Sequence, residues 1–103
     1  MAAYIIAEIE VNDPAGYEEY KEMVPGSIAR HGGRYLVRGP VVEQVEGDWP
    51  LKRLAIVEFP NAQRARDWWN SADYRPARDL RQRTARTRMI LVEGVAPGTG
   101  GKN

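Results

Sequence analysis

The chain has 103 residues, of which 28% are charged and 43% hydrophobic, and it carries a formal net charge of +1 and no cysteine. This length suits one domain rather than two, and the composition is ordinary for a globular protein. The absence of cysteine excludes disulfides, thiolate metal sites and a cysteine nucleophile, and it fits a reducing compartment such as the cytoplasm.

The small net charge hides an asymmetry along the chain. Residues 1–50 carry four Lys/Arg and nine Asp/Glu, whereas residues 51–103 carry eleven and five. The basic half predicts either a face for an anionic partner or a surface that packs against the acidic half or a second subunit. The N-terminus lacks a basic signal-peptide segment, and no apolar run approaches the ~20 residues of a membrane helix. We therefore expect a cytoplasmic location and no membrane partner.

The first elements are a strand and a helix. Residues 3–11 alternate between a fully apolar face and a face that ends in acidic residues, as a half-buried strand does. Asp13 and Pro14 are typical of a helix start, and Gly32 is typical of a helix end. Between them, Pro25 predicts a kink or break in the helix.

The second strand is expected at residues 34–38, between glycines that favour turns. Strict alternation places Tyr35 and Val37 on one face and Arg38 on the other. Residues 41–45 are expected to continue this arm as an edge strand, before a turn and a third strand.

Residues 52–59 form the third expected strand, in which Glu58 shares a face with Ile56. Asn61 then caps a second helix. Helical spacing places Trp69 on the buried stripe of this helix and Trp68 at its margin.

The last elements follow an interruption around Tyr74. Pro76 opens one or two further helical turns, and residues 88–95 form the fourth strand. Residues 96–103 are expected to be a flexible tail. The inward positions of the helical turns are Ala77, Leu80 and Thr84.

The order strand, helix, strand, strand, helix, strand predicts an α+β, ferredoxin-like fold in residues 1–95. This fold is a four-stranded antiparallel sheet with the helices on one face. Because the strands are apolar on parts of both faces, the uncovered face is expected to pack on a second sheet. We therefore expect a homodimer that is joined sheet to sheet.

Several segments together resemble a known family over residues 3–95. They are Gly32-Gly33-Arg34-Tyr35-Leu36-Val37-Arg38-Gly39, Glu46-Gly47-Asp48-Trp49, Glu58-Phe59-Pro60, Trp68-Trp69-Asn70-Ser71 and Leu91-Val92-Glu93-Gly94. The family is the uncharacterised domain of unknown function 1330, and Pro40 and Trp69 depart from its usual Gly and Tyr. The resemblance implies the dimeric α+β barrel superfamily, which includes cofactor-free monooxygenases, haem-degrading enzymes, muconolactone isomerases and stress-responsive barrels. It implies no settled activity.

Two residues are candidate general bases. His31 is the only histidine, which leaves no familiar multi-histidine zinc or haem site. It acts either as a base or as a helix-end residue that suits the helix dipole. Glu58 is either a base beside Arg38 or Arg53, which would hold an anionic substrate, or part of a structural ion pair.

Trp69 and Tyr74 are candidate walls of a pocket between helices and sheet, although core packing is the alternative for each. The arginine run in residues 75–88 raises the question of nucleic acid. The central strands lack the aromatic platform of RNA-binding sheets, and the isoelectric point of about 8.1 is too low. We therefore expect no nucleic acid partner.

Two functions remain open. The first is a cofactor-independent isomerase or monooxygenase-like enzyme that acts on a small anionic or aromatic molecule, with no cofactor and no metal. The second is a non-catalytic dimer that binds a ligand or a protein. The enzyme requires Glu58, His31 and an arginine to converge on a cavity of ~300 Å³ or more.

Overall fold

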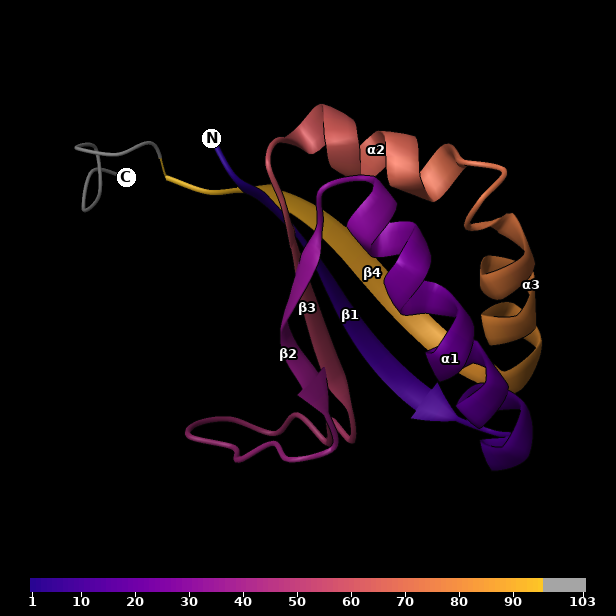
Figure 1. Ribbon diagram of the computed structural model, residues 1–103. Coiled ribbons are helices and arrows are strands. Elements are labelled where there is room, and N and C mark those ends of the chain that lie inside the picture. The colour runs from indigo at the N-terminus through magenta and orange to yellow at the C-terminus, as the bar shows by residue number, and fades with distance from the viewer. Residues whose placement is uncertain (96–103) are drawn as a thin grey trace.

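The computed structural model describes residues 1–95. Its elements are β1 (Ala3–Val11), α1 (Pro14–Arg30), β2 (Arg34–Gly39), β3 (Leu54–Phe59), α2 (Ala62–Asn70), α3 (Arg75–Thr84) and β4 (Ala85–Glu93). The strands form one antiparallel sheet in the order β2-β3-β1-β4, and the helices cover one of its faces (Figure 1). The expected ferredoxin-like fold is confirmed. Within the described residues, no helix has both the length and the apolar character to cross a membrane.

The core fills the layer between the helices and the inner face of the sheet. Ile5 and Ile9 of β1 and Val57 and Phe59 of β3 are buried there. Burial of each such large apolar side chain stabilises the fold by about 1.5–3 kcal/mol. The buried apolar side chains of α1 are Tyr17, Tyr20, Val24 and Ile28.

The helix ends follow the capping residues that the sequence contains. Asp13 accepts a hydrogen bond from the backbone N–H of Gly16 at 3.2 Å, and Asn61 accepts one from Arg64 at 2.9 Å. Gly32 follows α1 with φ of 78°, a conformation that glycine adopts without strain. These local predictions are confirmed.

The α1 helix runs unbroken through Pro25, so the expected break is wrong. A proline has no N–H to donate to the carbonyl four residues before it, which here belongs to Lys21. The side chain of Arg38 supplies a donor instead, because its Nη2 lies 2.8 Å from Lys21 O. The helix therefore continues, and a β2 side chain satisfies the free carbonyl.

A bulge at Leu36 overturns the expected alternation of β2. Tyr35 pairs with the buried Val57, whereas Val37 pairs with Ile56 on the opposite face. The extra residue between them shifts the register and reverses the faces that follow. Sequence periodicity cannot detect this shift, since the strand reads as regular on both sides of it.

The same bulge turns Arg38 toward the helices. Arg38 pairs with Ala55, which lies on the same face of β3 as Val57 because strand side chains alternate. The guanidinium accordingly reaches α1, as its bond to Lys21 O shows. Without the bulge, Arg38 faces the other side of the sheet.

The segment between β2 and β3, residues 40–53, is a loop that projects from the end of the sheet (Figure 1). The expected edge strand at residues 41–45 is therefore wrong, and β3 starts at Leu54 rather than at residue 52. The ladder of β2 and β3 ends with the pair of Gly39 and Leu54. Residues 41–45 pair with no neighbouring strand, whatever their β propensity.

The second half of the chain departs from the expected helical faces. Trp68 is buried and Trp69 only half-buried, the reverse of the prediction. The α3 helix is longer than expected, it buries Arg81 in place of Leu80, and β4 begins directly after it at Ala85. The predicted tail at residues 96–103 lies outside the described residues.

Gly33 lies where the end of α1 meets β3, and it offers a test of this packing. A Cβ at Gly33 would lie 2.7 Å from Phe59 and 2.8 Å from Ile28, whereas a Cβ at Gly39 would meet no atom within 4 Å. Gly33→Ala is expected to lower the free energy of unfolding by about 1–3 kcal/mol through overpacking. Urea unfolding monitored by circular dichroism measures this change, and Gly39→Ala is the matched control. Equal stabilities of the two variants would contradict this packing.

Candidate functional site

A polar centre lies between the helices and the sheet. The hydroxyl of Tyr74, which precedes α3, lies 3.3 Å from the hydroxyl of Tyr20 on α1. The Nε of Arg81 on α3 donates to the Tyr74 hydroxyl at 3.3 Å. All three residues are buried, and burial raises the pKa of the Tyr20 phenol far above its ordinary value. Both the cation and the neutral phenols are thus held inside the fold.

Arg81 is an unbalanced buried charge. Only 3% of its surface is exposed, and no carboxylate of residues 1–95 forms an ion pair with it. A buried charge is costly unless an opposite charge or hydrogen bonds compensate it. One hydrogen bond to Tyr74 is modest compensation for a group with five N–H donors. An anion from outside the chain would complete it.

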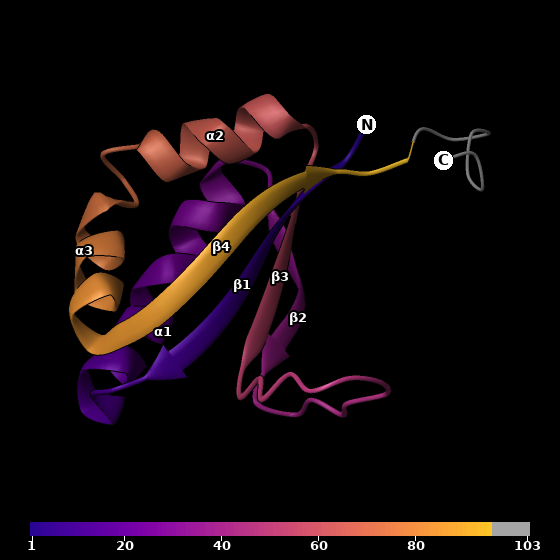
Figure 2. The ribbon, with the colours of Figure 1, turned by 180° about the vertical axis from the view of Figure 1, so that it is seen from behind.

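Arg81 lines a cleft between α2, α3 and β4, which we call the β4 cleft. Its volume is about 530 Å³, within the ~300–1,000 Å³ of small-molecule sites. Figure 2 shows the three elements that frame it at the β4 edge of the sheet. Its apolar lining comes from Ile5, Ala65, Ala85, Met89, Ile90 and Leu91. The cleft can therefore hold an apolar body beside a cation.

Trp69 forms one wall of the β4 cleft, and its role in binding a ligand stays a prediction. Its ring centroid lies 5.3 Å from the guanidinium carbon of Arg78 and 5.9 Å from that of Arg81. Thr87 also lines the cleft, and its Oγ1 is buried without a hydrogen-bond partner among the described residues. Such an atom in a native fold needs a partner, and a water molecule or a polar group of a ligand would satisfy it.

Tyr74 supports the cleft from behind. It is fully buried, and its ring stacks on Trp68 with 4.0 Å between centroids. Its ring lies 6.1 Å from that of Trp69. The predicted wall residue thus acts by positioning Arg81 through its hydroxyl, while Trp69 faces the cleft.

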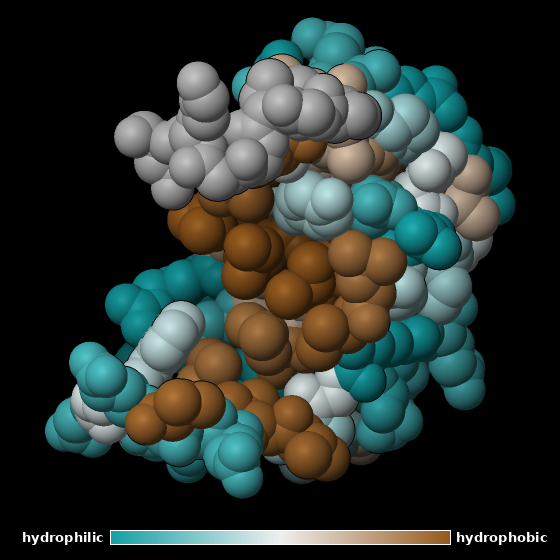
Figure 3. Space-filling view, turned by 90° about the vertical axis from the view of Figure 1, so that its left-hand side faces the viewer, coloured by the Kyte–Doolittle hydropathy of each residue, from teal (hydrophilic) through white to brown (hydrophobic). Residues whose placement is uncertain are grey.

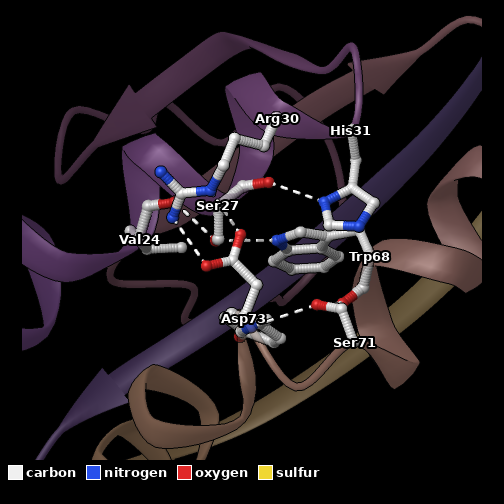
Figure 4. A network of polar contacts seen from close by, with 8 residues as sticks. Val24, Ser27, Arg30, His31, Trp68, Ser71 and Asp73 are labelled. Carbon is white, nitrogen blue, oxygen red and sulfur yellow. Dashed lines mark hydrogen bonds and ion pairs between the residues drawn. The ribbon is translucent and has the colours of Figure 1, made fainter.

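A hydrogen-bond network around Trp68 (Figure 4) also holds the backbone of Tyr74. Trp68 Nε1 donates to Ser27 Oγ at 3.0 Å, and Ser27 Oγ donates to Val24 O at 2.8 Å. Ser71 Oγ donates to Trp68 O at 2.8 Å and accepts from the backbone N–H of Tyr74 at 3.0 Å. The Trp68 ring is therefore anchored through its indole nitrogen, and Tyr74 through its backbone N–H.

His31 belongs to the end of this network. Its Nδ1 lies 2.8 Å from Ser27 O, and because a carbonyl only accepts, Nδ1 carries the proton. Nearby, the carboxylate of Asp73 accepts two bonds from Arg30, at 2.6 and 2.7 Å. The hydrogen bond from Arg30 holds the pKa of Asp73 below its ordinary value. The bonds between Arg30 and Asp73 hold the C-terminal end of α1 against the segment before α3.

Glu58 lies on the opposite face of the sheet. Arg34 Nε donates to Glu58 Oε1 at 2.8 Å, across the register pair that the two residues form. Neither Glu58 nor His31 lines the β4 cleft. Glu58 and His31 therefore do not converge with an arginine on one cavity, as the predicted enzyme requires. A catalytic role for either stays a prediction, and their placement gives it no support.

Arg38 and Arg53 do come together, at a second place. A cavity of about 30 Å³ lies beneath α1 among Tyr17, Tyr20 and Tyr35, and we call it the α1 cavity. Both arginines line it, and its volume is enough for a water molecule but not for an organic ligand. Burial raises the pKa of Tyr17, and it raises that of Tyr35 to about 12.

Arg81 and the three tyrosines of the α1 cavity were not predicted as site residues from the sequence. A signal for Arg81 exists in the helical spacing. Ala77, Arg81 and Thr84 fall at i, i+4 and i+7 and form the buried stripe of α3. An arginine on such a stripe is a sign of a buried charge with a role.

Three solved structures share the fold of this chain. A protein of unknown function from Rhodopseudomonas palustris has a TM-score of 0.74 and 18% identity, and the match covers 93% of this chain and 84% of that one. A dimeric ferredoxin-like protein of unknown function from Jannaschia sp. CCS1 has 0.74 and 10%, with 91% and 100% covered. SnoaB, a cofactor-independent oxygenase from Streptomyces nogalater, has 0.68 and 13%, with 94% and 96% covered. At these identities the similarity shows a shared fold.

The chain belongs to the family described as Domain of unknown function (DUF1330), whose model matches residues 2–95. The resemblance noted in the sequence is therefore confirmed. No curated protein matches the chain. Because the family description assigns no activity, function has to be argued from the site.

The network around Trp68 can be tested through Ser27. Ser27→Ala leaves the buried Trp68 N–H without a partner and is expected to lower the free energy of unfolding by about 1–3 kcal/mol. Gln63→Ala is the control, because it removes a hydrogen bond to Asp67 that is exposed. Thermal and urea unfolding measure both variants. A Ser27→Ala protein as stable as the control would show that the network does not anchor Trp68.

Proposed function

We propose that this protein binds a small organic anion with a flat apolar body in the β4 cleft. The observation that carries the proposal is the buried guanidinium of Arg81, which lines the cleft without a carboxylate partner in residues 1–95. A carboxylate or an enolate oxygen would balance this charge. Trp69 and the apolar lining would contact the rest of the ligand.

The groups that line the β4 cleft favour binding over proton transfer. Among the described residues, its lining contains arginines, a glutamine and a threonine but no aspartate, glutamate, histidine, lysine or cysteine. A general base of the usual kinds is therefore missing from this site. In an oxygenase-type reaction at this site, the substrate would have to lose its proton without a protein base, and Arg81 would stabilise the resulting anion. The similarity to SnoaB extends to the fold and makes this second candidate worth testing.

We also propose that two copies of the chain pack sheet to sheet. One apolar row crosses the outer face through all four strands, from Val37 through Ile56 and Ile6 to Ile90. Figure 3 shows the hydrophobic patch on this side of the molecule. Exposed apolar patches of this kind mark interaction surfaces. The relative from Jannaschia is described as dimeric.

Ion pairs flank the apolar row. On one side Arg88 Nε donates to Glu8 Oε1 at 2.7 Å, and on the other Arg34 pairs with Glu58. Trp49 from the projecting loop also donates to Glu8, and these bonds hold the pKa of Glu8 below its ordinary value. Charges that are already paired lower the cost of burying this face against a second copy. A cytoplasmic location and the absence of nucleic acid partners stay predictions.

The ligand proposal predicts that 2-naphthoate binds and that Arg81→Gln weakens its affinity at least tenfold, since the variant loses a charged contact. Isothermal titration calorimetry measures the affinity, and circular dichroism checks that the variant is folded. Arg83→Gln, an exposed arginine of the same helix, is the control and should bind as the original protein does.

The neutral analogue 2-naphthalenemethanol separates charge from shape. It is expected to bind more weakly than 2-naphthoate and to be insensitive to Arg81→Gln. Equal affinity of Arg81→Gln and the original protein for 2-naphthoate would refute the role of Arg81. An equal loss in Arg83→Gln would show that only the overall charge matters.

The dimer proposal predicts that Ile90→Asp produces monomers. Ile90 is 57% exposed in the single chain and also lines the β4 cleft, so the substitution changes the outer face and the rim of the cleft rather than the core. A charge buried within an interface is expected to raise the dissociation constant of the dimer at least ~30-fold. Sedimentation velocity measures the mass, and Met23→Asp on the exposed side of α1 is the control. A dimer that survives Ile90→Asp would contradict the proposal.

A further inference from the structure

A second set of cations lies at the end of β2, away from the β4 cleft. Lys21 of α1, Arg38 of β2 and Arg53 before β3 line an opening together with Gly39 and Pro40, and we call it the arginine mouth. We infer that the arginine mouth binds the phosphate group of a small molecule. This inference goes beyond the proposed function and does not depend on it, because the two openings share none of their lining residues.

The position of Arg38 is fixed before any ligand arrives. The bulge at Leu36 turns the residue toward the helices, and Pro25 leaves the carbonyl of Lys21 free for its Nη2. The guanidinium carbon also lies 4.6 Å from the centroid of the Tyr35 ring. The bulge, the free carbonyl of Lys21 and the Tyr35 ring thus together hold the Arg38 guanidinium at the opening.

Arg53 is held in a similar way. Its carbonyl accepts a backbone hydrogen bond from Ile9 at 3.0 Å, which ties the segment to β1. Its guanidinium carbon lies 5.3 Å from the centroid of the Tyr17 ring. Side chains that are ordered in advance lose less entropy when they bind, so these two arginines form a prearranged pair.

The charges of the arginine mouth are not balanced within the described chain. Glu18 pairs with Lys21 at 3.0 Å, but no ion pair of residues 1–95 includes Arg38 or Arg53. Three cations and one carboxylate leave a local charge of +2. A phosphate ester carries roughly −1.5 to −2 at pH 7 and is the group that paired arginines recognise best.

The shape of the arginine mouth also suits a compact polar group. It has a volume of about 460 Å³ and opens widely to solvent, and Pro40 is the one apolar side chain in its described lining. The space beside Gly39 is open, because a Cβ at this position would meet no atom within 4 Å. The α1 cavity behind it holds only about 30 Å³. The phosphate group would therefore rest between the arginines while the rest of the molecule stays outside.

The phenols of the α1 cavity add donors behind the opening. Burial raises the pKa of both Tyr17 and Tyr35, so each stays protonated at neutral pH. Neither hydroxyl makes a side-chain hydrogen bond within the described part of the chain. A neutral O–H beside two guanidinium groups is suited to an oxyanion and not to a cation.

The test uses inorganic phosphate and phenyl phosphate as probes, titrated into the full chain labelled with ¹⁵N. Saturable shifts of the backbone signals of Lys21, Arg38, Gly39 and Arg53 are expected. Phenyl phosphate that binds more tightly than inorganic phosphate would identify an organic phosphate as the source. Equal affinities would identify free phosphate, and both outcomes support the site.

Two variants remove the site in different ways. Arg38→Gln combined with Arg53→Gln is expected to weaken phosphate binding at least tenfold. Gly39→Asp leaves both arginines in place and puts a carboxylate into open space, and it is expected to give a similar loss in a protein that remains folded. Arg64→Gln, at an exposed arginine of α2, is the control whose charge change equals that of Gly39→Asp.

Three results would overturn the inference. They are the absence of saturable shifts with either probe, wild-type affinity in both site variants, and a loss in Arg64→Gln as large as theirs. If the double variant does not fold, the phosphate affinity of Gly39→Asp alone tests the inference.

Discussion

The buried guanidinium of Arg81 is the constraint around which the interior of this protein is arranged. Its Nε needs an acceptor inside the fold, and the Tyr74 hydroxyl is that acceptor. Tyr74 in turn stacks on Trp68, whose indole N–H is held by Ser27 of α1. A cation in the core thus connects α1, α2 and α3 through one chain of contacts. Because this chain contains no carboxylate, it leaves the cation open to an anion from outside.

The helices cover one face of the sheet, so the two candidate ligand sites and the proposed subunit interface lie mainly on opposite faces and meet at Ile90. On the covered face, arginines meet tyrosines and Trp69 at two openings, the β4 cleft and the arginine mouth. On the bare face, an apolar row lies between paired charges, and Glu58 belongs to one of those pairs. The residue that looked most like a general base in the sequence therefore lies on the side that suits a partner subunit. The description of the family assigns no reaction, and the similarity to SnoaB extends to the fold alone.

Local chemistry made much of the fold predictable. Asp13, Asn61 and Gly32 act through their nearest neighbours, so the helix ends could be read directly, and the order of elements then fixed the sheet. The site was harder to predict because it depends on long-range register. The bulge that turns Arg38 inward is invisible in a pattern that alternates on both sides of it. The choice between adjacent tryptophans depends on how α2 packs, and Trp68 was therefore misplaced.

The role of Arg81 is tested most directly by following its own Nε–H signal in a ¹⁵N NMR titration with 2-naphthoate. This nitrogen donates a hydrogen bond to the Tyr74 hydroxyl inside the fold, and Arg81 also lines the β4 cleft. If Arg81 contacts the ligand in the β4 cleft, its Nε–H signal shifts and saturates at the same ligand concentration as the backbone signals of Trp69 and Thr87. An Arg81 signal that stays unchanged while other arginines shift would contradict it.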